Sequence, residues 1–291
     1  MVPCGLRVRS GSPPRTRNRR EVRLAPAWGW SESGGVTSWW GQARLLTYRL
    51  KVYAFAVDDL LVDAGSWSLR GPFWAFFEGR MPRRVALTHM HEDHCGNAAA
   101  LAERGAAILA PAAGLAQAAV EPRLPLYRRL IWGRRPAFPA LPLPGLLETD
   151  RHAFRVLPGP GHTADHVLFH ELSRGWLFTG DFFLTATPRV IFQDEDLRVT
   201  LETLEKLSSL DFETLFDTHQ GPLENGPALL RRKRDYLLDL RGRVSALREA
   251  GLSDQAIDRR LFPRKPLITH VSRGEWSSLH MVRTVGRGEG E

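Results

Sequence analysis

The six residues from His89 to His94, His-Met-His-Glu-Asp-His, constrain the fold of this 291-residue chain more than any other stretch. They follow a β-prone run at 85–88, so we expect them in a loop at the end of a strand, where neighbouring side chains can diverge. Imidazole and carboxylate donors together suit zinc, iron or manganese. The stretch therefore predicts half of a two-metal site.

Three later segments carry the donors that such a site still needs. They are residues 159–166, 178–181 and 217–221, which contain histidines, aspartates and neighbouring glycines. Each donor stands at the C-terminal end of a predicted strand or in the loop after one. A catalytic metal site takes ligands from several segments so that one coordination position stays open for water. A lone histidine is more often a structural residue, so only the ordered series favours metal binding.

Strand and helix signals alternate from residue 45 onward, which is typical of an α/β domain. Residues 45–55 and 60–63 form a predicted hairpin, and the alanine-rich stretch 95–103 predicts a helix. Prolines and aromatic residues at 121–146 indicate a short helix and a long loop. Further strands are expected at 85–88, 108–110, 154–157, 166–170, 176–179 and 214–217, with a helix at 197–209.

Composition divides the chain into a leader, a central domain and a tail. Residues 1–44 hold eight arginines and two acidic residues, and we expect this leader to be disordered. It is interpreted as an over-extended start, a transit peptide or a nucleic-acid-binding arm. Residues 45–225 form the predicted domain. Residues 226–291 form a predicted helical extension, in which Ser253 can cap a helix.

The net charge of +8 belongs mostly to the leader and says little about the folded body. The longest uncharged, alanine-rich stretch, 106–120, falls short of the roughly 20 residues that span a bilayer, so no membrane span is expected. The two cysteines, Cys4 and Cys95, make no disulfide framework, and Cys95 is expected to be a small core residue. We therefore expect a cytoplasmic protein, or an organellar one if the leader is a transit peptide.

The motif His-x-His-x-Asp-His, a later Gly-His-Thr, a Gly-Asp and a final histidine occur in this order between about residues 45 and 225. This series resembles the metallo-β-lactamase superfamily, within it the glyoxalase-II-like and ribonuclease-like branches. The resemblance implies an αββα sandwich with a small helical C-terminal extension, similar to members whose extension is winged-helix-like.

The resemblance also implies a ligand set for two divalent metal ions, zinc first, with iron or manganese as alternatives. One ion would take His89, His91 and His162, the other Asp93, His94 and His219, and Asp181 would bridge them. Asp63 matches an early Asp-x-Gly that supports the ligand loops, and His166 is expected to hydrogen-bond behind the ligands. Glu92 is expected to face solvent or to act as a charge at a helix N-terminus.

Two metal ions can share a water and hold the resulting hydroxide against an electrophilic centre, with Asp93 orienting it. The sequence thus predicts a binuclear hydrolase of a small-molecule ester, thioester or lactone. Residues 182–185 lack the Gly-Cys-Gly-Arg of glyoxalase II, which disfavours glutathione thioesters. Asp181 in place of the cysteine of classical β-lactamases disfavours antibiotics, and the lack of a long insertion disfavours the nuclease branch with a β-CASP domain.

Three alternatives stay open. A metal-dependent endoribonuclease acting on single-stranded RNA would use basic residues of the tail, 231–234 and 259–260, although a solvated helix face explains them too. A mononuclear-iron persulfide dioxygenase shares the fold. A non-catalytic RNA-binding module would use the leader. The segment 121–146 is either a lid over the metals or simple packing at a sheet edge.

Overall fold

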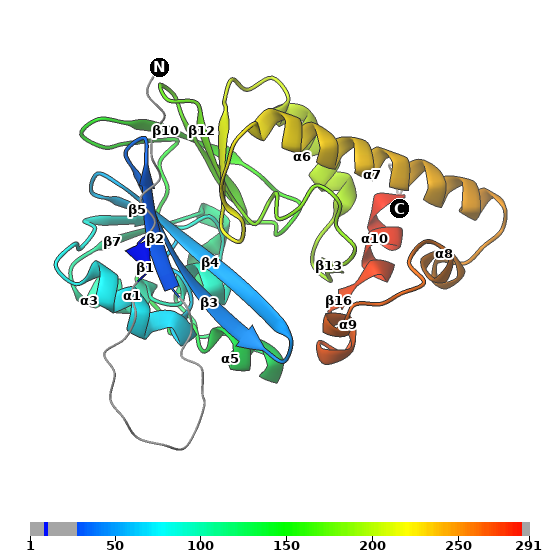
Figure 1. Ribbon diagram of the computed structural model, residues 1–291, viewed down its shortest axis with the longest axis horizontal. Coiled ribbons are helices and arrows are strands. Elements are labelled where there is room, and N and C mark those ends of the chain that lie inside the picture. Colours follow the sequence, from blue (N-terminus) through cyan, green and yellow to red (C-terminus); the bar gives the residue numbers. More distant parts are fainter. Residues whose placement is uncertain (1–8, 11–27, 287–291) are drawn as a thin grey trace. The chain divides into compact units, whose positions relative to one another are not determined.

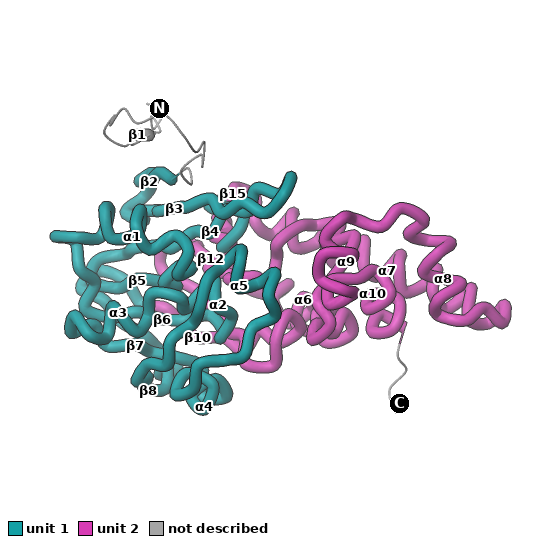
Figure 2. Tube along the Cα trace, turned by 90° about the horizontal axis from the view of Figure 1, so that it is seen from below, with its two compact units in different colours: residues 1–153, 218–222 teal, residues 154–217, 223–291 magenta. Residues whose placement is uncertain are grey.

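The computed structural model describes residues 9–10 and 28–286 (Figure 1). Contacts between Cα atoms divide the chain into two compact units. Unit 1 comprises residues 1–153 and 218–222, and unit 2 comprises residues 154–217 and 223–291 (Figure 2). This division differs from the predicted boundary at residue 225, because the helical tail shares its unit with the second half of the predicted domain.

Unit 1 contains a sheet whose strands follow one another in chain order. Neighbours are antiparallel from β1 to β5 and parallel from β5 to β8. Parallel neighbours bring their C-terminal ends to one edge of the sheet. The strands are β1 (Arg9–Ser10), β2 (Trp28–Ser33), β3 (Val36–Leu45), β4 (Tyr48–Val57), β5 (Leu60–Val62), β6 (Arg84–Ala86), β7 (Ala107–Ala110) and β8 (Leu141–Pro142).

Strands β2 and β3 require a correction, because the sequence predicts a disordered leader through residue 44. They form a hairpin whose turn uses Gly34 and Gly35, both at positive φ. Trp39 on β3 is fully buried and its ring meets the Phe73 ring edge-on at 5.2 Å. The arginine-rich composition of residues 1–23 masked this apolar stretch. Residues 1–8 and 11–27 lie outside the described part of the chain.

Short helices accompany the sheet of unit 1. The predicted helix at 95–103 is two helices, because the Asn97 side chain at the break donates to the carbonyl oxygens of Ala64 (2.7 Å) and Ser66 (3.2 Å). The predicted short helix within 121–146 is confirmed as α5. The helices are η1 (Trp67–Leu69), α1 (Arg70–Phe77), α2 (Glu92–Cys95), α3 (Ala98–Glu103), η2 (Ala112–Gly114), α4 (Leu115–Ala118) and α5 (Leu126–Trp132).

Unit 2 contains the strand order β14-β12-β11-β10. The β10–β11 and β11–β12 pairs are antiparallel, and β12–β14 is parallel, so the intervening chain crosses over through helix α6 (Leu197–Leu207). These strands confirm the predicted positions. They are β10 (Ala153–Pro158), β11 (Val167–Glu171), β12 (Trp176–Gly180) and β14 (Thr214–Asp217). The short strand β9 (Leu146–Glu148) belongs to unit 1, as do the first two residues of β15 (Gly221–Leu223).

The tail is helical, as the sequence predicts. Helix α7 (Gly226–Glu249) ends before Gly251 at φ +82°, and the Ser253 side chain caps α8 (Asp254–Leu261). Two further helices follow, α9 (Leu267–Val271) and α10 (Ser278–Val285). The one strand among the described residues after 226, β16 (Trp276–Ser277), pairs with β13 (Ile191–Phe192) rather than with a strand of the tail.

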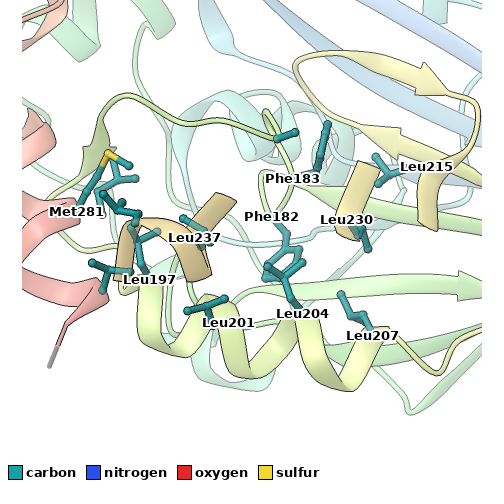
Figure 3. Close-up of a cluster of buried hydrophobic side chains, with 14 of the residues drawn as sticks. Phe182, Phe183, Leu197, Leu201, Leu204, Leu207, Leu215, Leu230, Leu237 and Met281 are labelled. Carbon is teal, nitrogen blue, oxygen red and sulfur yellow. The ribbon is translucent and has the colours of Figure 1, made fainter. Parts of the chain in front are cut away.

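The core of unit 2 joins its sheet to α6, α7 and α10. Leu201, Leu204 and Leu207 of α6 pack against Leu230 and Leu237 of α7 (Figure 3). Burial on this scale provides the main stabilising free energy of such a unit. Within the described part of the chain, no helix is both long and apolar enough to cross a membrane.

Two adjacent leucines of α7 test this core. Leu237 is fully buried, so Leu237→Ala should lower the free energy of unfolding by about 2–5 kcal/mol. Leu238 is 38 % exposed, and Leu238→Ala should cost less than about 1 kcal/mol. Urea denaturation measures both. Equal losses in the two variants would contradict the assigned burial.

Candidate metal centre

The buried carboxylate of Asp63 organises residues 89–94, the predicted ligand loop of unit 1. Asp63 follows β5 and Thr88 lies just beyond the end of β6, so the parallel pairing of these strands brings the two residues to one edge. Asp63 is fully buried and has φ +59°. Its carboxylate accepts from the Thr88 amide at 2.8 Å and from the Thr88 hydroxyl at 3.0 Å. These bonds hold the residue directly before His89.

The same carboxylate orients His94. Nδ1 of His94 lies 2.7 Å from Oδ2 of Asp63, and both side chains are buried. A carboxylate only accepts, so Nδ1 carries the proton and Nε2 carries the lone pair that a metal requires. The hydroxyl of Thr218 also donates to Asp63 Oδ2, at 3.2 Å. The structure thus places Asp63, which was predicted to support the ligand loops, in contact with Thr88, His94 and Thr218.

His219 is oriented by backbone. The amide of Tyr53 donates to the Thr218 carbonyl at 2.7 Å, which holds residues 218–219 against β4. Nδ1 of His219 lies 2.5 Å from the carbonyl oxygen of Lys51, so it must donate and Nε2 has the lone pair. Nε2 of His219 lies 3.2 Å from Oδ2 of Asp93. A nitrogen lone pair and a carboxylate thus face the same space.

Unit 1 brings together five of the predicted ligands. The His89 ring centroid lies 4.6 Å from that of His91 and 4.0 Å from that of His94. Ligand atoms of Asp93, His94 and His219 lie within 4.8 Å of one another, as do those of His89 and His91. Imidazole and carboxylate donors that lie this close together fit divalent zinc, iron or manganese.

Unit 2 pairs the other two predicted ligands. His162 lies in the loop after β10 and Asp181 directly follows β12, and His162 Nε2 is 3.6 Å from Asp181 Oδ2. Gly161, at φ +137°, precedes the histidine, and a Cβ there would lie 2.4 Å from the Thr200 hydroxyl. Only glycine therefore fits before His162.

Two buried side chains stand behind this pair. Nε2 of His166, which was predicted to hydrogen-bond behind the ligands, accepts from the Asp181 amide at 3.3 Å, so its lone pair serves the backbone. Oε1 of Glu195 lies 3.5 Å from Nδ1 of His162 and accepts from the Phe192 amide at 2.8 Å. No sequence motif pointed to Glu195, since it lies 33 residues beyond His162 in the chain.

Glu92 differs from the expectation that it faces solvent. It opens the short helix α2 but is only 1 % exposed. Its carboxylate accepts two hydrogen bonds from Arg128 of α5, at 2.6 and 2.5 Å. Burial raises the pKa of Glu92, although the Arg128 charge opposes that shift. This pair joins the ligand loop to the segment 121–146.

Helix α5 also places an aromatic ring near a ligand. The Trp132 ring centroid is 6.0 Å from that of His219. The segment 121–146 thus contacts the ligand loop in unit 1 rather than only a sheet edge. Cys95 is fully buried, its thiol donates to the His91 carbonyl at 2.9 Å, and burial raises its pKa well above the usual range, which fits a core residue.

The Asp63 carboxylate can be tested without changing the size of the side chain. Asp63→Asn replaces one acceptor oxygen by an amide group, which disturbs the hydrogen bond from His94 and should weaken metal binding by about 10–100-fold. The control Asp59→Asn lies at the other end of β5, where Asp59 binds Arg84 at the surface. Competition with a chelator measures both affinities. Equal affinities in the two variants would contradict the assigned role.

Comparison with known proteins identifies the family. The model of the metallo-beta-lactamase superfamily matches residues 52–219. A hydroxyacylglutathione hydrolase of Cereibacter sphaeroides is 31 % identical over 211 residues, covering 68 % of this chain and 75 % of that protein. One of Nitrosomonas eutropha is 30 % identical over 153 residues, covering 52 % and 53 %.

Solved structures show the same fold. A metallo-beta-lactamase family protein of Thermus thermophilus has a TM-score of 0.60 at 20 % identity, covering 86 % of this chain and 91 % of that one. A metallo-beta-lactamase of Pontibacter korlensis has a TM-score of 0.57 at 16 % identity, covering 73 % and 99 %. The chain therefore belongs to the metallo-beta-lactamase superfamily and has its mixed α/β fold with a helical C-terminal region.

Proposed function

We propose that this protein is a metal-dependent hydrolase that cleaves thioesters with the help of two divalent ions. The observation that carries the proposal is the cluster of five donors in unit 1, in a chain whose relatives are named hydroxyacylglutathione hydrolases. The proposed ligands are His89, His91 and His162 for one ion, Asp93, His94 and His219 for the other, and Asp181 as the bridge.

The side chains of the loop perform orientation and proton handling. Asp63 and the Lys51 carbonyl keep the protons of His94 and His219 on Nδ1, so that both Nε2 atoms retain the lone pair that would bind a metal ion. Asp93 Oδ2, 3.2 Å from His219 Nε2, would also accept a proton from the attacking water and orient it. When bound, the two ions supply an acidified water and positive charge for a developing oxyanion.

The substrate is proposed to be an acyl thioester. The matched relatives are named hydroxyacylglutathione hydrolases, yet residues 182–185 read Phe-Phe-Leu-Thr where glyoxalase II has Gly-Cys-Gly-Arg. Phe182 and Phe183 are buried in the core of unit 2, so this stretch offers no charged side chain to a glutathione carboxylate. Trp132 is buried beside His219, and its ring adds an apolar wall there rather than a charge. These features favour thioesters of other carriers.

Zinc is the proposed metal, with iron or manganese as alternatives, because histidine and aspartate donors suit all three. Metal analysis of the purified protein should find about two ions per chain. A single iron ion per chain would instead favour the persulfide dioxygenase.

A thioester panel tests the activity. The metal-loaded protein should hydrolyse acyl thioesters, and Asp93→Ala should lower kcat/KM by about 100-fold or more because it removes a ligand and the proton acceptor. Asp150→Ala, at an exposed turn of unit 1, is the control and should retain full activity. Lactones and labelled single-stranded RNA are assayed in parallel. RNA cleavage that Asp93→Ala abolishes, without thioester cleavage, would overturn the proposal in favour of a ribonuclease.

A further inference from the structure

We propose that Lys233, in the C-terminal helix α7, is a positioning residue that holds the loop carrying Asp181 and thereby controls metal binding by that loop. The inference rests on the proposed assignment of Asp181 as the bridging ligand. All of the contacts that carry it lie within unit 2.

The Lys233 side chain reaches the residues that directly follow Asp181. Its Nζ donates to the carbonyl oxygens of Phe182 at 2.5 Å and Phe183 at 2.8 Å. It also lies 5.4 Å from the centroid of the Phe182 ring. Lys233 is only 6 % exposed, so these carbonyls replace the water that an ammonium group would otherwise bind.

Two other buried side chains hold the same loop by its amides. Nε2 of His166 accepts from the Asp181 amide, and Oδ2 of Asp217, at the end of β14, accepts from the Leu184 amide at 2.7 Å. Leu184 has φ +50°, a strained conformation for a leucine. Four consecutive residues, 181–184, therefore bond through their backbones to side chains from three separate segments of the chain, and Lys233 is the cation among them.

Burying an ammonium group at this position has a large desolvation cost. Lys233 occupies the buried stripe of α7, between Leu230 and Leu237, where an apolar side chain would pack without losing hydration. Burial is the largest influence on its pKa and lowers it to about 8, so the group is still charged at pH 7. Lys233 is the one charged residue among the buried residues of α7, and it lies where the helix contacts the loop that carries Asp181. This placement points to a role in arranging the loop.

The charge of Lys233 also faces the carboxylates that surround both unit 2 ligands. Glu195, Asp217 and Asp181 each act electrostatically on it. Glu195 lies 3.5 Å from His162 Nδ1, so its carboxylate adds negative charge beside that residue, and the Lys233 ammonium opposes this charge. Removing the ammonium would leave three nearby carboxylates without it and release two carbonyls of the loop.

The test compares Lys233→Met, which keeps the length and removes the charge, with Arg232→Met on the exposed side of the same helix. Two properties of the whole chain are measured. Hydrogen exchange of the Asp181 and Leu184 amides in metal-free protein reports on the loop, and titration with Zn²⁺ and Co²⁺ reports on metal binding. Lys233→Arg, which keeps a cation and donors, is the conservative variant.

Lys233→Met should speed exchange at Asp181 and Leu184 by about tenfold or more, because a charge-assisted contact of the loop is lost. It should weaken binding of at least one ion by about 10–100-fold and change the visible spectrum of bound Co²⁺. Arg232→Met should resemble the unmodified protein, and Lys233→Arg should recover part of the affinity.

Unchanged exchange, or faster exchange with unchanged metal affinity, would overturn the inference. If Lys233→Met does not fold, Lys233→Arg decides: loop exchange and affinity near those of the unmodified protein support the inference, and failure of both opposes it. The proposed function fails in a different way, since the unmodified protein would then bind fewer than two ions whatever happens to the exchange of the loop amides.

Discussion

The Asp63 carboxylate is the interaction on which the ligand loop of unit 1 depends. It is fully buried, and it accepts hydrogen bonds from Thr88, His94 and Thr218, which come from three separate segments. Hydrogen bonds to a buried carboxylate are strong, and losing the acceptor would leave buried donors without a partner. One side chain thus fixes the positions of Thr88 beyond β6, His94 in α2 and Thr218 next to His219.

Unit 2 uses the same principle with the opposite charge. The ammonium of Lys233 holds carbonyl oxygens of the loop after Asp181, while His166 and Asp217 hold its amides. In each unit, buried ionic or imidazole side chains therefore hydrogen-bond to the segment that carries the proposed ligands. A ligand loop built in this way gains precise direction at a cost in desolvation, which the surrounding apolar core offsets.

Local patterns predicted most of the elements, because alternation and helical spacing are properties of a single segment. The strands at 154–157, 166–170, 176–179 and 214–217 and the helical tail followed from them. The hairpin β2–β3 did not, since the arginine-rich residues before it dominated the composition of the first 44. The helix at 95–103 was predicted unbroken because the contacts of Asn97 that interrupt it come from residues 64 and 66.

The residues proposed as metal ligands were identified from the sequence alone, because donors at strand ends occupy short motifs whose chemistry is local. What supports them was decided by tertiary structure alone. Glu92 meets Arg128 across 36 residues and Lys233 meets Phe182 across 51, distances that only packing closes. Lys233 in particular reads as one member of a basic run, and its place on the buried stripe with Leu230 and Leu237 becomes evident only when α7 lies against its core. Glutamate, arginine and lysine are usually surface residues, but here they are buried or half-buried and support the proposed site. Away from water, each of their polar groups needs a hydrogen-bond partner within the protein, because an unsatisfied buried group costs free energy.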